Sequence, residues 1–356
     1  MERVLIYGMT DNTGGIETYL LNLTRRMQGQ LAFDFVSDFT SIAYQEELQK
    51  LGSRFFYIPP KGRHLFQHWR QLWSILRQHP EYRTVYFNIL DAGCAFTEFI
   101  PWLLGRKIVT HSHNSDTEKK RLHRICRPFL NIFTKEYVAC SQVAAEYMFG
   151  SSKKARIIPN TIDVQKFVFD PESRRQVRQE LKAGDAPVLC HVGRLSPQKN
   201  PIGMLDIFQE VLNKCPEAIL VSVGTGEMDE EVHAYAKRIG VAEHVRFLGK
   251  RNDVSRILQG ADVFFLPSLY EGFVIVALEA QAAGLHCVVS SNNTKEIDLT
   301  GNVRFLSLEE PYALWADVLL QEAAKERTDT SEAVRAHGYD NQHCEQTDAQ
   351  LLAILR

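Results

Sequence analysis

Two glutamates, Glu271 and Glu279, stand eight residues apart in the otherwise apolar stretch PSLYEGFVIVALEAQAAG, residues 267–284. A carboxylate buried among apolar side chains without partners is strongly destabilising, so each of these groups must meet hydrogen-bond donors. A carboxylate can accept two O–H bonds at once, which matches the neighbouring hydroxyls of a sugar or a ribose. The pair therefore indicates a site for a polyhydroxylated ligand.

Two cations follow another apolar run, in the loop HVGRLSPQKNP at 191–201. Arg194 and Lys199 are five residues apart, and Gly193 precedes them. A guanidinium and an ammonium at the end of a strand can neutralise a diphosphate, although solvated surface cations would look the same in isolation. Gly193 beside Arg194 favours the phosphate interpretation. Together with the two glutamates, the loop describes a site for a nucleotide-sugar.

A third loop, GMTDNTGGIE at 8–17, contains Gly14 and Gly15 just before a helical stretch. Glycines let a ligand approach the backbone, and a helix N-terminus offers free N–H groups to an anion; a simple tight turn is the alternative. The segment VGTGEMD at 223–229 has Gly224 but lacks the third glycine of the dinucleotide fingerprint. It is therefore only weak evidence for NAD.

These loops can form one site only if the fold brings the ends of their strands together at one edge of a sheet. Short apolar runs such as RVLIYG (3–8) alternate with amphipathic stretches such as IETYLLNLTRRM (16–27), which predicts an α/β fold with parallel sheets covered on both faces. The rhythm stops in the polar segment 170–187 and then restarts. We therefore expect two Rossmann-like domains, 1–165 and 166–339, and a last helix at about 340–356 that can pack on either.

The composition fits this organisation. The 356 residues leave room for two domains, and 45% hydrophobic with 24% charged residues is typical of a soluble globular protein. We find no signal-peptide pattern, and seven scattered cysteines form no C-x-x-C pair, which predicts reduced thiols and a cytoplasmic location. The net charge of −2 combines +6 in residues 1–165 with −8 in the remainder. We expect no nucleic-acid partner.

The ordered motifs resemble glycosyltransferase family 4, the retaining enzymes of the GT-B fold, and within it the bacterial enzymes of exopolysaccharide or capsule biosynthesis. The resemblance covers nearly the whole chain. It implies two Rossmann-like domains whose parallel sheets face each other across a cleft, with the C-terminal helix returning to the first domain. The motifs are GGIETYLLNL, HSHN, VACS, IIPNTIDVQKF, VGRLSPQKN, VGTGEMDEEV, VRFLGKRNDV and ADVFFLPSLYEGFVIVALEAQAAG.

The resemblance also implies roles for individual residues. Glu271 matches the glutamate that meets the donor sugar, and Glu279 the one that holds the ribose; Arg194 and Lys199 match the cations on the diphosphate. A histidine at a strand end of the first domain contacts the transferred sugar, and THSHN offers both His111 and His113, with His113 favoured. The remaining donor-binding positions are Gly14, Gly15, Gly193, Gly224, Lys250 and Arg251 near the base, Gly272, and the backbone of Phe273, Val274 and Ile275.

The implied activity is retaining transfer of a sugar from a UDP-sugar, or from GDP-mannose, to a saccharide or lipid-linked saccharide. No cofactor is expected. The chain contains no D-x-D metal motif, so Arg194, Lys199 and helix N-termini would answer the charge of the leaving diphosphate. A nucleotide-sugar epimerase on the same fold and a non-catalytic nucleotide-sugar-binding protein are the alternatives. The chain departs from the family at His286, where proline is usual, and at Val274, where Gly or Pro is common.

A basic segment, KKRLHRICRPFLNIFTK at 119–135, has six Lys or Arg residues and no acid. Its apolar residues Leu122, Ile125, Phe129 and Phe133 have helical spacing. The pattern predicts an amphipathic helix that lies on an anionic membrane at its inner face. A helix whose apolar stripe faces the protein core, with a solvated basic side, is the alternative.

Overall fold

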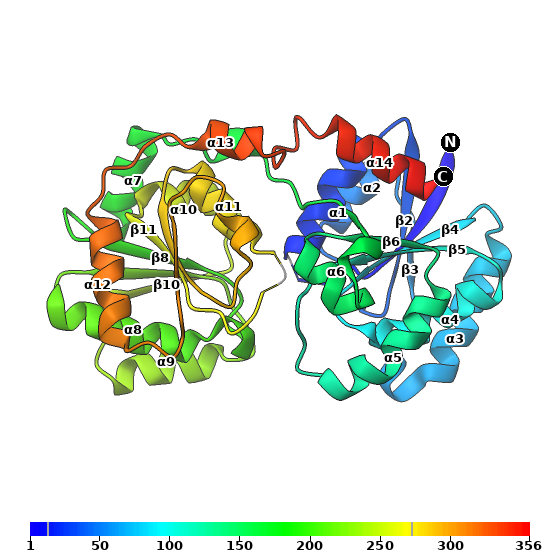
Figure 1. The fold of residues 1–356 in the computed structure, drawn as a ribbon, viewed down its shortest axis with the longest axis horizontal. Coiled ribbons are helices and arrows are strands. Elements are labelled where there is room, and N and C mark those ends of the chain that lie inside the picture. The colour runs from blue at the N-terminus through cyan, green and yellow to red at the C-terminus, as the bar shows by residue number, and fades with distance from the viewer. Residues whose placement is uncertain (13, 272) are drawn as a thin grey trace. The chain divides into compact units, whose positions relative to one another are not determined.

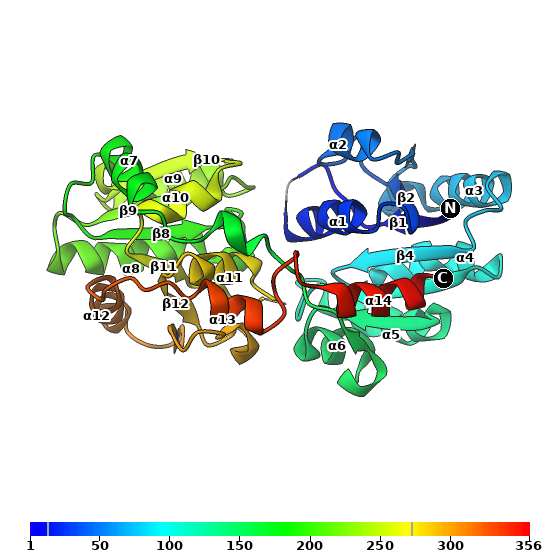
Figure 2. The same ribbon diagram turned by 90° about the horizontal axis from the view of Figure 1, so that it is seen from above.

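The computed structural model describes residues 1–12, 14–271 and 273–356, and these form two compact units (Figure 1). Unit 1 consists of Met1–Asn160 together with Cys344–Arg356, and unit 2 of Thr161–His343. Each unit contains one parallel sheet with helices on both faces (Figure 2). The predicted α/β class with two parallel sheets is confirmed. The sequence-based division at 165/166 lies a few residues beyond the point where the structure divides the chain.

The described part of unit 1 contains a seven-stranded sheet in the order β3-β2-β1-β4-β5-β6-β7. Its strands are β1 (Glu2–Tyr7), β2 (Leu31–Ser37), β3 (Phe55–Tyr57), β4 (Thr84–Ile89), β5 (Lys107–Ser112), β6 (Glu136–Ala139) and β7 (Arg156–Ile157). Its helices are α1 (Gly15–Arg26), α2 (Gln45–Lys50), α3 (Lys61–Gln78), α4 (Ala95–Leu103), α5 (Lys120–Phe133), α6 (Gln142–Phe149) and α14 (Glu345–Leu355).

Burial explains why these segments form the sheet of unit 1. Every residue of β2 and β4 is buried, which is the pattern of a central parallel strand covered on both faces. Helix α14 completes this core, because Leu351, Ile354 and Leu355 pack in the same cluster as the β1 side chains. An ion pair between Arg26 and Asp348, at 2.8 Å, ties α14 to α1.

The described part of unit 2 contains a six-stranded sheet in the order β10-β9-β8-β11-β12-β13. Its strands are β8 (Val188–Val192), β9 (Ile219–Val223), β10 (Val245–Gly249), β11 (Val263–Leu266), β12 (His286–Ser290) and β13 (Val303–Leu306). Its helices are α7 (Pro171–Leu181), α8 (Pro201–Lys214), α9 (Asp229–Arg238), α10 (Val254–Gly260), α11 (Ile275–Ala282), α12 (Tyr312–Ala323) and α13 (Ser331–Ala336).

The strand order identifies where each sheet can bind a ligand. In unit 2, β8 lies between β9 and β11, and in unit 1, β1 lies between β2 and β4. At such a reversal the connections leave toward opposite faces, which opens a crevice beyond the carboxyl ends of the strands. The candidate loops after β8, β11 and β1 all begin at these two points.

Candidate functional site

In unit 2, the loops that follow β8 and β9 are stacked backbone to backbone. Gly193 N–H donates to Val223 O at 2.9 Å, and Leu195 N–H donates to Thr225 O at 3.2 Å. Gly224 has a φ of +130°, and a Cβ at this position would lie 2.1 Å from the carbonyl oxygen of Gly193. No side chain fits there. Glycine at 224 is therefore required by the contact between the two loops.

Arg194 extends from this double loop into solvent. Its side chain is 64% exposed and forms an ion pair with Glu227, Nη2 to Oε2, at 2.8 Å. Such an exposed pair contributes little stability, so an anionic ligand can displace Glu227 at small cost. Glu227 was not identified from the sequence, although it directly follows the glycine-containing GTG segment.

Lys199 and Glu271 form a largely buried ion pair. The distance from Nζ to Oε1 is 2.6 Å, and the two side chains are 17% and 8% exposed. The neighbouring Gln198 joins the same two loops, because its backbone O accepts from Leu269 N–H at 2.8 Å and its Nε2 donates to Tyr270 O at 3.0 Å. The sequence predicts that Lys199 and Glu271 bind different parts of a ligand; the structure places them in direct contact.

Glu279 has a different environment from Glu271. It lies within α11 and is partly buried, and burial raises its pKa to about 7. Among the residues that the structure describes, none donates a hydrogen bond to its carboxylate or forms an ion pair with it. Its oxygens are therefore available to hydroxyl groups of a ligand, which would replace the solvation lost on burial.

Helix α11 begins at Ile275. The Phe273 ring stacks on Tyr339, with centroids 5.2 Å apart and planes at 9°, so this side chain is held by packing within unit 2. Only the backbone of Phe273, Val274 and Ile275 remains for a ligand at the start of the helix. The predicted site residue Gly272 lies outside the described residues.

The departure from the family at His286 has a structural explanation. Its Nδ1 lies 2.8 Å from Oε2 of Glu322, a buried carboxylate that also contacts Arg304 at 3.0 Å and Lys325 at 2.7 Å. His286 is the first residue of β12, so it lies at the amino ends of the strands, whereas the candidate site lies at their carboxyl ends. The histidine therefore belongs to a structural cluster of charges.

A further loop of unit 2, the one that follows β10, is joined through the backbone to the loop after β9. Gly249 O accepts a hydrogen bond from Gly224 N–H at 2.9 Å, which places Lys250 and Arg251 beside the double loop. Arg251 is exposed and makes two hydrogen bonds to Asp253, each 2.7 Å long. Lys250 is exposed at the same turn.

In unit 1, His111 and His113 lie together at the carboxyl end of β5, with ring centroids 3.9 Å apart. His111 Nδ1 is 2.6 Å from the Tyr86 hydroxyl, which in turn is 3.1 Å from the Tyr19 hydroxyl. Both histidines are buried, and burial lowers the pKa of His113 to about 3 and that of His111 well below its usual value. Both rings are therefore neutral at pH 7.

His113 leaves one ring nitrogen available as an acceptor. His113 Nε2 is 2.9 Å from Asn88 Oδ1, so Nε2–H donates and Nδ1 remains an acceptor. Within the described part of the chain, this Nδ1 has no hydrogen-bond partner. Asn88 is paired with His111 in the register of β4 and β5. Sequence reasoning missed Asn88, Tyr86 and Tyr19, because strand pairing and not spacing brings them to the histidines.

The glycine loop of unit 1 is held by Glu17, another residue that sequence reasoning missed. Helix α1 begins at Gly15, and the buried Glu17 carboxylate accepts hydrogen bonds from Thr10 N–H at 3.1 Å and Thr10 Oγ1 at 2.7 Å. A Cβ at Gly14 would lie 2.7 Å from Glu17 Oε2. Gly14 and Gly15 are thus at a helix N-terminus, as predicted, with a buried carboxylate close to it.

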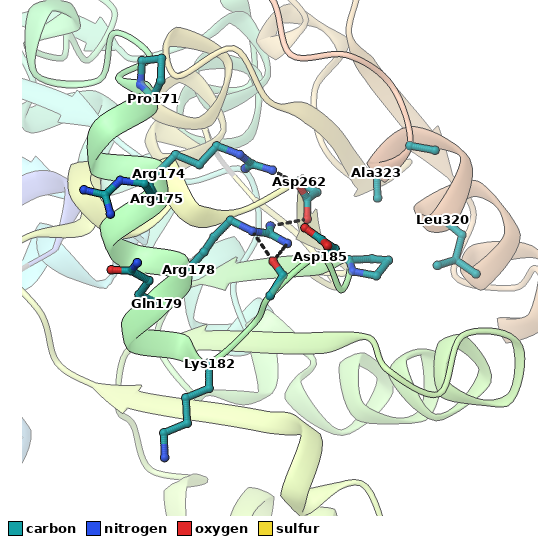
Figure 3. A pocket seen from close by; sticks show the side chains of 13 residues that line it. Pro171, Arg174, Arg175, Arg178, Gln179, Lys182, Asp185, Asp262, Leu320 and Ala323 are labelled. Carbon is teal, nitrogen blue, oxygen red and sulfur yellow. Dashed lines mark hydrogen bonds and ion pairs between the residues drawn. The ribbon is translucent and has the colours of Figure 1, made fainter.

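A cavity of about 710 Å³ in unit 2 lies away from these loops (Figure 3). Its walls include Arg174 and Arg178 of α7, and Asp262, which immediately precedes β11. Arg174 and Arg178 bind the two oxygens of Asp262 at 2.5 and 2.9 Å. The cavity is therefore at the amino ends of the strands, and these two arginines are engaged in a structural clamp.

Comparisons with known proteins agree with this arrangement. Residues 172–297 match the family model of group 1 glycosyl transferases, and residues 13–166 match that of Glycosyltransferase Family 4. The chain is 30% identical over 352 residues to a Bacillus subtilis (strain 168) protein named glycosyltransferase EpsF, covering 93% of this chain and 91% of that protein.

Two further comparisons concern an enzyme and a solved structure. The chain is 31% identical over 197 residues to the Escherichia coli UDP-Gal:alpha-D-GlcNAc-diphosphoundecaprenol alpha-1,3-galactosyltransferase, covering 51% of this chain and 50% of that one. The crystal structure of Anabaena HepE in complex with UDP and glucose matches with a TM-score of 0.83 and 20% identity, over 99% of both chains. At this identity, the likeness to HepE demonstrates the fold.

Proposed function

Because the chain belongs to glycosyltransferase family 4 and has the GT-B fold, we propose that it transfers a hexosyl group from a nucleotide-sugar with retention of configuration. The acceptor in this proposal is a saccharide or a lipid-linked saccharide of polysaccharide biosynthesis. The observation that carries the proposal is the contact between Lys199 and Glu271, which joins a phosphate-binding type of loop to a sugar-binding type of loop.

A UDP-sugar is the donor that the relatives favour. HepE was solved in complex with UDP-glucose, and the name of the Escherichia coli relative specifies UDP-Gal. GDP-mannose is the second choice, because a Mycolicibacterium smegmatis relative that is 32% identical over 43% of this chain is named as a GDP-mannose-dependent mannosyltransferase. A transferase that acts on either donor requires charge neutralisation at the diphosphate and acceptors for hydroxyl groups.

In this mechanism, the diphosphate displaces Glu227 from Arg194 and shares Lys199 with Glu271. Negative charge grows on the diphosphate as the sugar–phosphate bond breaks, and the two cations stabilise this charge more in the transition state than in the bound donor. The acceptor hydroxyl attacks on the face that the nucleotide leaves, and a diphosphate oxygen takes its proton. Attack and departure on one face retain the configuration.

The hydroxyl groups of the donor have separate partners. We assign the ribose diol to Glu279, whose carboxylate has no protein donor among the described residues, and the sugar hydroxyls to Glu271. In unit 1, the neutral His113 offers Nδ1 as an acceptor to a sugar hydroxyl. Lys250 and Arg251 are assigned to the base.

Donor binding and product configuration test this proposal. Titration with UDP-glucose, UDP-galactose and GDP-mannose should show saturable binding, and NMR of the product should show the anomeric configuration of the donor. An inverted product contradicts the mechanism. Accumulation of an epimerised donor without acceptor would indicate an epimerase, and binding without any turnover would indicate a binding protein.

Variants test the assigned roles. Glu279→Gln should weaken binding of free nucleotide, whereas Glu271→Ala should leave it nearly unchanged and depress transfer. Arg194→Ala should reduce kcat by roughly a hundred- to a thousandfold, since it removes one contact to developing charge. Arg175→Ala on α7 is the matched control and should leave kcat unchanged.

The proposal also includes metal independence. Excess EDTA should therefore change the rate little; activity abolished by EDTA and restored by magnesium contradicts metal independence.

The proposed site of action is the cytoplasmic face of the cell membrane. No helix in the described part of the chain is long and apolar enough to cross a bilayer. A lipid-linked acceptor presents its saccharide at the membrane surface, so the proposed function benefits from an enzyme that binds there peripherally.

A further inference from the structure

Helix α5 keeps its main apolar stripe on the surface of unit 1. The side that faces the core consists of His123, Cys126 and Leu130, which are buried. Ile125 and Phe129, by contrast, are 66% and 54% exposed. The interpretation of the stripe as a core-facing one is therefore wrong. The contact with the core is formed instead by His123, Cys126 and Leu130, on another side of the helix.

The apolar surface extends from α5 across two further helices. A chain of ring contacts runs from Phe66 to Trp69 (5.9 Å), on to Phe99 (5.3 Å) and Trp102 (6.2 Å), and ends at Phe133 (4.9 Å). These residues belong to α3, α4 and α5, whose helices lie side by side in unit 1 (Figures 1 and 2). The exposed apolar residues of this α3–α4–α5 surface are Phe66, Trp73, Phe96, Trp102, Leu103, Leu122, Ile125, Phe129 and Ile132.

The charges around this surface are mainly positive; two acids directly precede α5, Asp116, which forms an ion pair with Lys120 at 3.1 Å, and the exposed Glu118. The sequences of α3 and α5 contain no Asp or Glu, and the acid of α4, Glu98, is fully buried and accepts a hydrogen bond from Thr110 at 2.8 Å. A hollow of about 170 Å³ beside α5 is lined by Lys120, Arg124 and Arg127 together with His123. The exposed cations of the two helices are Arg63, Arg70, Arg77, Lys120, Arg121 and Arg124.

We propose that the α3–α4–α5 surface docks on a bilayer that contains anionic phospholipid. Aromatic and aliphatic side chains enter the interfacial region, and the surrounding arginines and lysines bind headgroup phosphates. The hollow beside α5 has the charge to receive one such phosphate. A second copy of the chain is a poorer occupant, because pairing this surface with itself would bring like charges together.

The docking surface deepens the proposed function, since it rests on an enzyme that meets lipid-linked acceptors, but vesicle binding can be measured without any transfer reaction. Cosedimentation with vesicles of phosphatidylcholine alone and of phosphatidylcholine with phosphatidylglycerol should show binding to the anionic vesicles only. Binding should weaken as salt is raised, because the headgroup contacts are screened. Equal binding to both vesicles, or to neither, overturns the inference.

Variants separate the apolar and the charged contributions. The triple variant Ile125→Ser/Phe129→Ser/Ile132→Ser should lose at least roughly tenfold in vesicle affinity, since each side chain withdraws apolar area from the interface. Arg121→Gln/Arg124→Gln should lose roughly tenfold to thirtyfold at low salt. The control is Tyr312→Ser/Leu314→Ser on α12 of unit 2, which also removes exposed apolar side chains, 41% and 39% exposed. This control should bind vesicles like the unmodified protein.

Folding controls and the other possible occupants of the α3–α4–α5 surface give distinguishable results. All variants should keep the melting temperature and the donor affinity; if the triple variant does not fold, the single variant Ile125→Ser replaces it. A control that loses as much affinity as the triple variant overturns the inference. A dimer in solution that the triple variant abolishes identifies self-association instead, and unchanged vesicle binding with loss of an acidic protein partner identifies a protein interface. Vesicle binding without any sugar transfer contradicts the proposed function and leaves the docking surface intact.

Discussion

The ammonium of Lys199 and the carboxylate of Glu271 form a largely buried ion pair with each other in unit 2. A ligand diphosphate that draws on Lys199 therefore changes the surroundings of the glutamate that we assign to the sugar. At the residue scale, the phosphate and sugar ends of the proposed donor site are thus electrostatically coupled through this ion pair.

The first prediction concerns this coupling. Lys199→Met should lower the free energy of unfolding by about 3 kcal/mol, because it leaves the Glu271 carboxylate largely buried without its cation. The double variant Lys199→Met/Glu271→Gln should recover most of this loss, since the remaining amide is neutral. Urea unfolding of the protein without ligand measures both. A single variant as stable as the original protein would show that water already neutralises Glu271.

The second prediction uses the pKa of Glu279, which burial raises to about 7. The folded protein holds this proton more tightly than the unfolded chain, where a Glu has a pKa of ~4.3, so the free energy of unfolding falls as the pH rises between these values. Glu279→Gln removes the charged form. It should therefore be more stable than the original protein at pH 8, by about 2–3 kcal/mol, and equally stable at pH 4.

The control for Glu279 is Glu309→Gln, which replaces an exposed carboxylate in the same unit. Its stability should follow that of the original protein across the pH range. Unfolding curves at several pH values make the comparison. A Glu279→Gln variant whose advantage is independent of pH would show that steric relief, and not the proton, is responsible.

Residue types and spacing were sufficient to select the cations and carboxylates that we assign to the donor site, but not to identify their partners. Glu227, which binds Arg194, follows a glycine segment that on its own looked like a weak dinucleotide motif. Asn88 reaches the histidines only through the parallel register of β4 and β5. Such partners depend on how strands pair, and a single sequence does not encode the register in a readable pattern.

At the scale of elements, the strands were predictable because buried parallel strands are short apolar runs bounded by turn residues. The apolar run RVLIYG at 3–8, for example, overlaps β1, Glu2–Tyr7. Helix ends were less predictable: α11 begins at Ile275, and the Phe273 ring just before it packs on Tyr339, far along the chain. For α5, periodicity revealed an apolar stripe but could not say whether the stripe or another side faces the core.

The third prediction tests the stacked loops after β8 and β9. Gly224→Ala should abolish donor binding and destabilise unit 2 by several kcal/mol, because its Cβ would lie 2.1 Å from Gly193 O. Gly240→Ala is the matched control, since Gly240 also has a positive φ, +80°, but no atom within 4 Å of an added Cβ. It should cost only about 1 kcal/mol. Calorimetry and nucleotide titration compare the two variants, and similar losses in both would contradict the stacking argument.

At the scale of the whole molecule, the two units have separate cores, and unit 1 is built from two separate segments of the chain, Met1–Asn160 and Cys344–Arg356. Composition and the restart of the strand–helix rhythm predicted two domains, and the family was identified from the order of the motifs. The strand–helix pattern left open which domain the last helix joins, whereas the family resemblance implied a return to the first domain, to which α14 belongs in the structure. The answer depends on Leu351, Ile354 and Leu355, whose burial in the core of unit 1 is a tertiary contact.

The fourth prediction follows from the separate cores. Leu355→Ala should lower the stability of unit 1 by about 2–5 kcal/mol, because it leaves a cavity in a fully buried position. Unit 2 should be unaffected. In calorimetry with saturating UDP, the nucleotide should raise only the transition of unit 2, and the variant should lower only the other one. A single transition that both changes shift would show that the units unfold together.

The return of α14 to unit 1 has a consequence for biosynthesis. A ribosome must translate all of Thr161–His343 after the first part of unit 1 has emerged and before α14 is made. At bacterial elongation rates this takes on the order of ten seconds, during which the apolar groove for Leu351, Ile354 and Leu355 is uncovered. The nascent chain therefore exposes apolar surface of the kind that chaperones bind, and we expect removal of Glu345–Leu355 to leave unit 1 prone to aggregation.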